Sequence, residues 1–274
     1  MTALPTRKLE AWRYADLAAL GEVWPQAAGA QREIGVAAGE TARLDDVLTG
    51  SGWRNDEVTI SVGAGGRLEG VIDQAGADVT TQLYRVTLER GASADLVVLN
   101  HGGRFGRIAL EITLGERADF RLGGVLLGSD AQTLEIVTTV RHAGPGATSR
   151  QVIRAVAGGR ATTSYLGQVA VAREGQQTDA AQSFKALLLN RGATANAKPE
   201  LEIFADDVKC AHGATVGELD RNALFYLESR GVLPREAQAM LARAFLADAL
   251  DGVTDAARDA IEARLAALLE AQQP

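Results

Sequence analysis

The only cysteine of this 274-residue chain, Cys210, lies two residues before one of its three histidines, His212. If this segment is a strand, residues i and i+2 share one face, with side chains roughly 7 Å apart. That separation is too long for a Cys–His nucleophile pair, which needs about 3 Å. It suits two ligands that face a common partner. The simpler alternative is that Cys210 fills a small buried space and His212 supports a strand end.

The chain holds few soft ligands for a closed metal centre of its own. A closed zinc or iron–sulfur site generally takes four Cys or His ligands, and this chain supplies one Cys and three His. The other histidines, His101 and His142, are expected to be hydrogen-bonded residues at strand ends, because no nucleophile elbow accompanies them. A closed site within one chain is therefore disfavoured, whereas a half-site at Cys210 and His212 that a second subunit completes stays open beside the simpler alternative.

Two further motifs are not expected to carry chemistry. The glycine-rich GAGG at 63–66 lacks a following Gly-Lys-Ser/Thr and a helix, so it indicates a turn and not a phosphate loop. Asp206 and Asp207 are adjacent, and neighbours in a strand point to opposite faces. They cannot form an acid–base pair across one substrate, and a role in a turn is favoured.

Composition excludes several classes of protein. Hydrophobic residues make up 46% and charged residues 23%, which is ordinary for a globular protein. The net charge of −7 gives no basic field for nucleic acid or anionic lipid. No signal-like segment and no run of eighteen apolar residues is present, and one cysteine cannot form an internal disulfide. We expect a cytoplasmic protein that binds neither nucleic acid nor membrane.

The residue pattern divides the chain into a short helical segment at 1–30, a β region at 31–215 and a helical domain at 216–274. In the β region, apolar and polar residues alternate in short runs such as 58–62 and 108–114, separated by Gly/Ala/Thr turns with irregular spacing. This pattern favours a β-solenoid or a β-sandwich, and periodicity alone does not choose between them.

Capping residues predict the helices at both ends. Near the N-terminus, Thr6 is expected to cap a helix that ends by Gly21. Asp220 is expected to cap the first C-terminal helix, which stops at Gly231. Pro234 then opens a second helix with the apolar stripe Ala237, Met240, Leu241, Ala244 and Phe245. Thr254 caps a third helix with the stripe Ala257, Ile261, Leu265 and Leu268.

Four segments of the chain resemble the SufB/SufD family of the SUF iron–sulfur cluster assembly system. PTRKLEAWRYADL at 5–17 is similar to the family's Trp-Arg-Tyr signature, with Ala15 in place of a threonine. The segments at 140–151 and 176–217 are similar to the family core, and LDRNALFYLESRGVLPREAQAMLARAFLADAL at 219–250 is the most specific match. The SufD members match better, because the cluster cysteine of SufB members lies in a different segment. Many members carry a longer helical region before the first signature.

The resemblance implies a non-catalytic scaffold. The implied fold is a right-handed parallel β-helix core followed by a C-terminal helical domain. It would pair with a SufB-like subunit or with itself through the β body, and its C-terminal helices would dock a SufC-like ATPase. The expected ATPase contacts are Leu224, Phe225, Tyr226, Arg230, Phe245 and Leu246. No cofactor is expected to be permanently bound, and a transient iron–sulfur cluster would form at His212 and, more weakly, Cys210.

Two other functions stay open. One is a homodimeric β-helix adaptor with no metal role. The other is a polysaccharide-processing β-helix enzyme, which would need clustered carboxylates and exposed aromatic platforms. Only 5% of the residues are aromatic, which disfavours the enzyme. The β body is also expected to fold when the chain is cut at Gly217.

Overall fold

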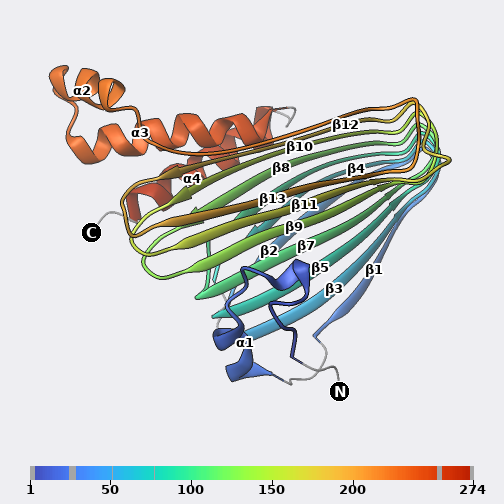
Figure 1. Cartoon of the computed structure of the whole chain (residues 1–274), viewed down its shortest axis with the longest axis horizontal. Coiled ribbons are helices and arrows are strands. Elements are labelled where there is room, and N and C mark those ends of the chain that lie inside the picture. The colour runs from blue at the N-terminus through green and yellow to red at the C-terminus, as the bar shows by residue number, and fades with distance from the viewer. Residues whose placement is uncertain (1–3, 25–28, 51, 77, 252–254, 272–274) are drawn as a thin grey trace.

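Two parallel β-sheets of seven strands each form the body of the protein. A computed structural model describes residues 4–24, 29–50, 52–76, 78–251 and 255–271. Odd-numbered strands make one sheet and even-numbered strands the other, so the chain crosses between the sheets after every strand (Figure 1). This winding is a β-helix, or β-solenoid, which confirms the expected fold class. A sandwich of antiparallel hairpins is excluded, because the neighbouring strands pair in parallel.

The strands are similar in length, and most have ten residues. The odd sheet contains β1 (Gln31–Val36), β3 (Trp53–Val62), β5 (Val79–Leu88), β7 (Phe105–Leu114), β9 (Thr133–His142), β11 (Thr162–Val171) and β13 (Thr194–Ile203). The even sheet contains β2 (Thr41–Leu48), β4 (Arg67–Gln74), β6 (Ser93–Asn100), β8 (Asp119–Gly128), β10 (Thr148–Ala157), β12 (Asp179–Leu188) and β14 (Lys209–Glu218).

The early turns of the solenoid repeat with a regular length, and equivalent corner residues of successive turns form a column with positive φ. In register, Thr41 pairs with Arg67, Arg67 with Ser93 and Ser93 with Asp119, so the early turns of the solenoid take 26 residues each. Later turns are longer. In the first six turns, from β1–β2 to β11–β12, one corner residue has positive φ: Gly39, Gly65, Gly91, Arg117, Gly146 and Gln177. Glycine fills four of these six positions, and the two exceptions hide the period from inspection of the sequence.

The core lies between the two sheets, in the lumen of the solenoid. Because strand side chains alternate between faces, every second residue points inward, as Val58, Ile60 and Val62 do with 0% exposure. Equivalent residues of successive turns stack in rows and form one continuous apolar cluster. The alternation read from the sequence therefore predicted the inward face correctly.

The N-terminal segment packs on the outer face of the odd sheet. Its α-helix, α1 (Leu17–Val23), is capped by Asp16, whose side chain accepts hydrogen bonds from two backbone N–H groups. The expected cap at Thr6 and end at Gly21 are wrong. Between residues 4 and 15, the only helical element is the 3-10 turn η1 (Glu10–Trp12). Contacts with the odd sheet hold the segment before Asp16 in place. The guanidinium of Arg107 stacks on the Trp12 ring, 4.0 Å from its centroid.

The C-terminal helices are α2 (Arg221–Ser229), α3 (Pro234–Ala247) and α4 (Asp255–Ala271), with the short turn η2 (Asp248–Leu250) after α3. The cap at Asp220, which accepts from the N–H of Asn222 at 2.8 Å, is confirmed. So is the stop at Gly231, where φ is +88°, and Pro234 opens α3 as expected. The expected cap at Thr254 lies outside the described residues.

Helices α3 and α4 pack on the outer face of the even sheet, away from α1 (Figure 1). The expected stripe of α4 is confirmed at Ile261 and Leu265. The stripe of α3 is partly wrong, because the buried residues are Ala237, Ala242 and Leu246, whereas Met240 is 44% exposed. Residues i and i+2 lie about 200° apart around a helix, so with Ala242 packed in the apolar cluster on the sheet, Met240 faces the surface. No helix among the described residues is long and apolar enough to cross a bilayer.

Candidate functional site

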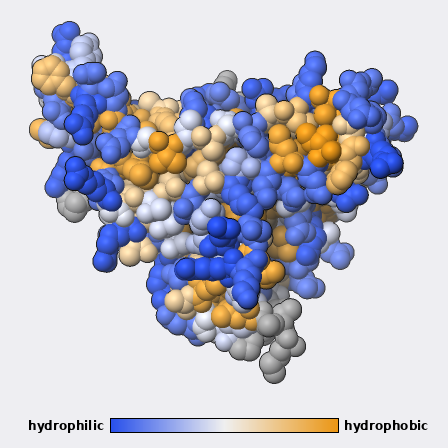
Figure 2. Space-filling model, in the orientation of Figure 1, coloured by the Kyte–Doolittle hydropathy of each residue, from blue (hydrophilic) through white to orange (hydrophobic). Residues whose placement is uncertain are grey.

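The last turn of the solenoid is open. β13 and β14 stand at the ends of their sheets, with no further strand of the described chain beside them. Nearly every residue of β14 is exposed, on both faces of the strand. Apolar side chains are exposed here as well, with Ile203 at 39%, Phe204 at 60% and Val216 at 48%. Hydrophobic surface gathers over these last strands in Figure 2. Such an uncovered edge is a template for pairing with another chain.

Cys210 and His212 lie on β14 and both occupy inward-facing rows. Cys210 pairs in register with Ala180 and His212 with Gln182, and both partners are inward and buried. The structure therefore places the two side chains on one face, as their spacing predicted. Cys210 is half-buried at the edge of an apolar cluster that includes Val169. His212 is exposed at the mouth of the lumen.

The environment of Cys210 disfavours its thiolate. Burial raises the pKa of the Cys210 thiol, and the negative charge of Asp179 raises it further. The thiolate is the form that binds metal or attacks sulfur, so the isolated chain holds this cysteine in its less reactive form. His212, in contrast, is exposed, and imidazole is a suitable ligand for iron. Of the two side chains, His212 is therefore the more accessible to a second chain.

The other histidines have internal hydrogen bonds. His101 follows β6, and its Nε2 lies 2.8 Å from the Asp73 carboxylate, which also accepts from Arg264 of α4 at 2.6 Å. His142 ends β9 and lies 2.9 Å from the Ser149 hydroxyl. Both are bonded strand-end residues, as expected.

The two adjacent aspartates also fall where they were expected. Asp206 and Asp207 lie in the turn between β13 and β14. The N–H of Asp207 donates to the Gln176 side chain at 3.1 Å. Within the described ranges, no group of three or more His, Cys, Asp or Glu side chains is arranged to hold a metal ion.

A polar row inside the lumen leads to His212, and sequence analysis missed it. Gln151 of β10 and Gln182 of β12 precede His212 in the same inward row. Gln151 is fully buried and accepts a hydrogen bond from the Tyr165 hydroxyl at 3.1 Å. The sequence did contain a signal for this row. In β10 and in β12 a glutamine occupies an inward position, where alternation predicts an apolar residue.

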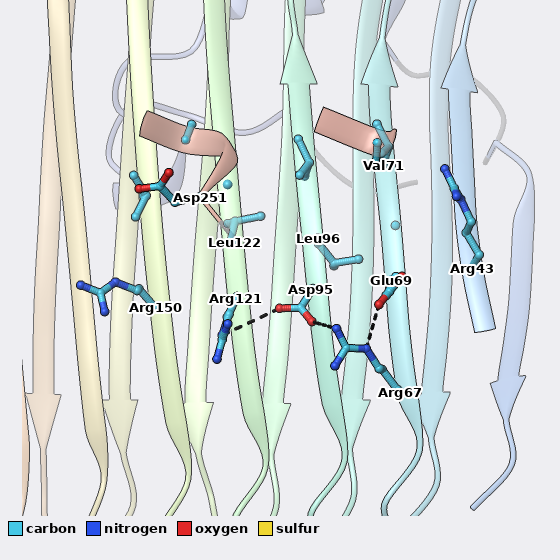
Figure 3. Close-up of a pocket in the computed structure, with 16 residues that line it drawn as sticks. Arg43, Arg67, Glu69, Val71, Asp95, Leu96, Arg121, Leu122, Arg150 and Asp251 are labelled. Carbon is cyan, nitrogen blue, oxygen red and sulfur yellow. Dashed lines mark hydrogen bonds and ion pairs between the residues drawn. The ribbon is translucent and has the colours of Figure 1, made fainter. Parts of the chain in front are cut away.

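A groove on the outer face of the even sheet is not connected with this row. Figure 3 shows it lined by charged residues of successive strands under η2 and the start of α4. Arg67 pairs with Glu69 and Asp95 at 2.8 Å, and Arg121 lies 3.9 Å from Asp95. These charges neutralise one another along the ladder. The groove is therefore best explained as a charged surface ladder of the solenoid.

Helix α2 presents an exposed aromatic surface. None of its residues is buried, and Phe225 and Tyr226 are 72% and 57% exposed. The Arg230 guanidinium lies 5.2 Å from the Tyr226 ring, and Leu224 is half-buried. Figure 2 shows hydrophobic atoms on this projecting end of the molecule. Of the two residues expected to face a partner from α3, Leu246 is instead fully buried against the body, and Phe245 is half-buried.

Comparison with known proteins identifies the family. The model described as "SUF system FeS cluster assembly, SufBD core domain" matches residues 26–245, which include the solenoid, α2 and most of α3. The chain belongs to the SufB/SufD family. The match covers the open edge with Cys210 and His212 as well as the exposed surface of α2.

Curated members of the SufB/SufD family are similar over part of their length. Iron-sulfur cluster assembly protein SufD of Escherichia coli (strain K12) is 34% identical over 145 residues, which are 53% of this chain and 33% of that protein. Protein ABCI7, chloroplastic, of Arabidopsis thaliana is 34% identical over 168 residues, 61% of this chain and 35% of that protein. The family protein ML0594 of Mycobacterium leprae (strain TN) is 29% identical over 215 residues, 74% of this chain and 55% of that protein. The matched regions thus span between a third and about half of these relatives.

Proposed function

We propose that the chain is a non-catalytic scaffold subunit of iron–sulfur cluster assembly. In this proposal it pairs through β14 with a second family subunit, of SufB type or another copy of itself. His212, with Cys210 secondary, supplies part of a transient cluster site at the junction. The observation that carries the proposal is the placement of both side chains on one face of an exposed edge strand. Family membership supports the role in cluster assembly.

Membership of the SufB/SufD family also argues against a polysaccharide-processing enzyme. The cytoplasmic location stays a prediction.

Backbone geometry supports pairing at β14. The N–H of Lys209 donates to the Thr178 carbonyl on the β12 side. Because N–H groups alternate sides along a strand, those of Cys210, His212, Ala214 and Val216 face the free edge. A second strand can bond to them without disturbing the solenoid, as in strand addition. Pairing would also cover the exposed side chains of Ile203 and Val216.

The surface of α2 supports docking of a SufC-like ATPase. The described residues include no phosphate-binding glycine motif, so coupling to ATP has to come through contact with another chain. Exposed Phe225 and Tyr226, beside the charged Arg230, have the composition of an interface centre. Helix α2 is connected to β14 only through Leu219 and Asp220. A movement of the docked ATPase could thus reach the strand that carries His212.

The first test measures cluster formation after replacement of His212. The complete complex, with SufB-type and SufC-type subunits, would receive iron and sulfide while visible absorbance records the cluster. We expect His212→Ala to slow formation at least about 10-fold and Cys210→Ser to slow it less. Thr215→Ala, an exposed change on the same strand, is the control. A normal rate for His212→Ala, with the complex intact, would support a plain adaptor and remove the metal role.

The second test concerns the free edge of β14. Ala214→Pro removes one edge N–H and leaves the bonds to β12, since proline is tolerated on edge strands. We expect its dissociation constant for a SufB-type subunit, or for self-association, to rise at least about 10-fold, because a backbone donor is lost and the approaching strand meets the proline ring. Analytical ultracentrifugation measures this, and Ala214→Ser is the control. Unchanged association of the proline variant would place the interface elsewhere.

A further inference from the structure

Gln182 is buried next to His212 without any hydrogen-bond partner. Its side chain is in register with His212 on the neighbouring strand, and parallel strands lie about 4.8 Å apart. Gln182 is 3% exposed, yet neither its Nε2 nor its Oε1 has a partner. Leaving a buried polar group unpaired costs about 1–3 kcal/mol. Native proteins seldom retain such a group without a reason.

The two neighbours of Gln182 in its row can satisfy both atoms. On the inner side, Gln151 Oε1 accepts from the Tyr165 hydroxyl at 3.1 Å and has a second lone pair free. On the outer side is His212. In the described part of the chain, His212 makes no side-chain hydrogen bond and remains exposed to water. Pairing of β14 with a second chain would remove that water and leave Gln182 as the polar neighbour within the lumen.

We propose that Gln182 is a positioning residue for His212, an inference that rests on the proposed function. One ring N–H of His212 donates to Gln182 Oε1, and Gln182 Nε2 donates to Gln151 Oε1. This arrangement fixes one tautomer and ring orientation and leaves the lone pair of the other ring nitrogen facing the partner subunit. A metal-binding histidine is commonly held in this way, through its second nitrogen. Both unpaired atoms of Gln182 are then used, which accounts for a buried amide at an inward position of β12.

The test observes the tautomer of His212 directly. In the complex with a SufB-type subunit, with histidine ¹⁵N-labelled in this chain, the two ring-nitrogen chemical shifts report which nitrogen carries the proton. We expect a single dominant tautomer in the wild type. Gln182→Met has similar length and no hydrogen bond, so it should give a mixture of tautomers and slow cluster formation about 10-fold. Gln182→Glu keeps an acceptor oxygen and should restore the single tautomer.

Gln74→Met is the matched control, because Gln74 is a fully buried glutamine with an unpaired Oε1 near the other end of the same sheet. It should leave the His212 tautomer unchanged. If Gln182→Met does not fold, Gln182→Asn, whose amide is set back by one methylene, is expected to give the same mixture. An unaltered tautomer in folded Gln182→Met or Gln182→Asn overturns the inference. Failure of the proposed function is a separate result, namely normal cluster formation by His212→Ala.

Discussion

At the scale of single residues, His142 is expected to make the fold sensitive to acid. It has no exposed surface, and burial lowers its pKa to about 4, although a backbone hydrogen bond at Ala147 opposes the shift. In the unfolded chain a histidine titrates near 6.5. Between these values the unfolded chain binds one more proton, so stability is full above about pH 6.5 and falls with pH by up to about 1.4 kcal/mol per unit.

The variant His142→Gln should remove this one contribution. Urea unfolding at several pH values between 7 and 4.5 gives the slope of the free energy of unfolding against pH. We expect this slope to be smaller for His142→Gln by nearly the contribution of one proton, about 1.4 kcal/mol per pH unit. The difference in slope does not depend on the stability of the variant at pH 7. An identical slope in both proteins would mean that His142 takes up its proton in the folded state.

At the scale of elements, the corner column predicts a stabilising substitution. Arg117 has φ of +52°, and of the other five corners with positive φ four are glycine and one is Gln177, at φ +62°. A left-handed conformation costs a non-glycine residue about 1 kcal/mol or more. Arg117→Gly should therefore raise the melting temperature, with a gain of about 0.5–1 kcal/mol after the entropy cost of glycine. Its exposed pair with Glu116 contributes little.

Two matched variants give the comparison for Arg117→Gly in thermal unfolding. Gly91→Ala at φ +66° meets no atom within 4 Å, so it should lower stability by about 1 kcal/mol through the backbone alone. Arg90→Gly, at an adjacent position without positive φ, should also lower it. If Arg117→Gly is destabilising as well, relief of backbone strain at a positive-φ corner does not stabilise the protein.

At the scale of the whole molecule, the helices have two separate tasks. Helices α3 and α4 cover apolar residues of the even sheet, among them Val97, Leu99 and Val125. Cutting the chain at Gly217, which the sequence suggested would spare the body, would expose this face and invite aggregation. Helix α2, in contrast, buries none of its residues. It can therefore be altered without loss of the core.

We accordingly expect the double variant Phe225→Ser with Tyr226→Ser to co-purify with at least about 10-fold less of a SufC-type ATPase. The melting temperature should change little, because both side chains are mostly exposed. Phe204→Ser, at the open edge and 60% exposed, is the control for loss of a surface aromatic residue. Full retention of the ATPase by the double variant would mean that α2 is not its docking surface.

The sequence by itself determined the features that depend on local chemistry. Alternation over residues such as Val58, Ile60 and Val62 identified the inward face, because the side-chain period of a strand is fixed by its backbone. Asp220 and Gly231 identified the ends of α2, because each satisfies or terminates backbone groups locally. The i, i+2 spacing placed Cys210 and His212 on one face for the same reason.

Only the tertiary structure decided features that depend on residues distant in sequence. The register of successive turns made neighbours of Gln151, Gln182 and His212, about 30 positions apart at each step. Trp12 packs against Arg107 of β7, so the segment before Asp16 lies on the odd sheet and the expected helix from Thr6 does not form there. The side of α3 that faces the sheet was likewise set by packing against a surface formed elsewhere in the chain. Local preferences cannot encode these choices, because each depends on which surfaces the winding of the solenoid brings together.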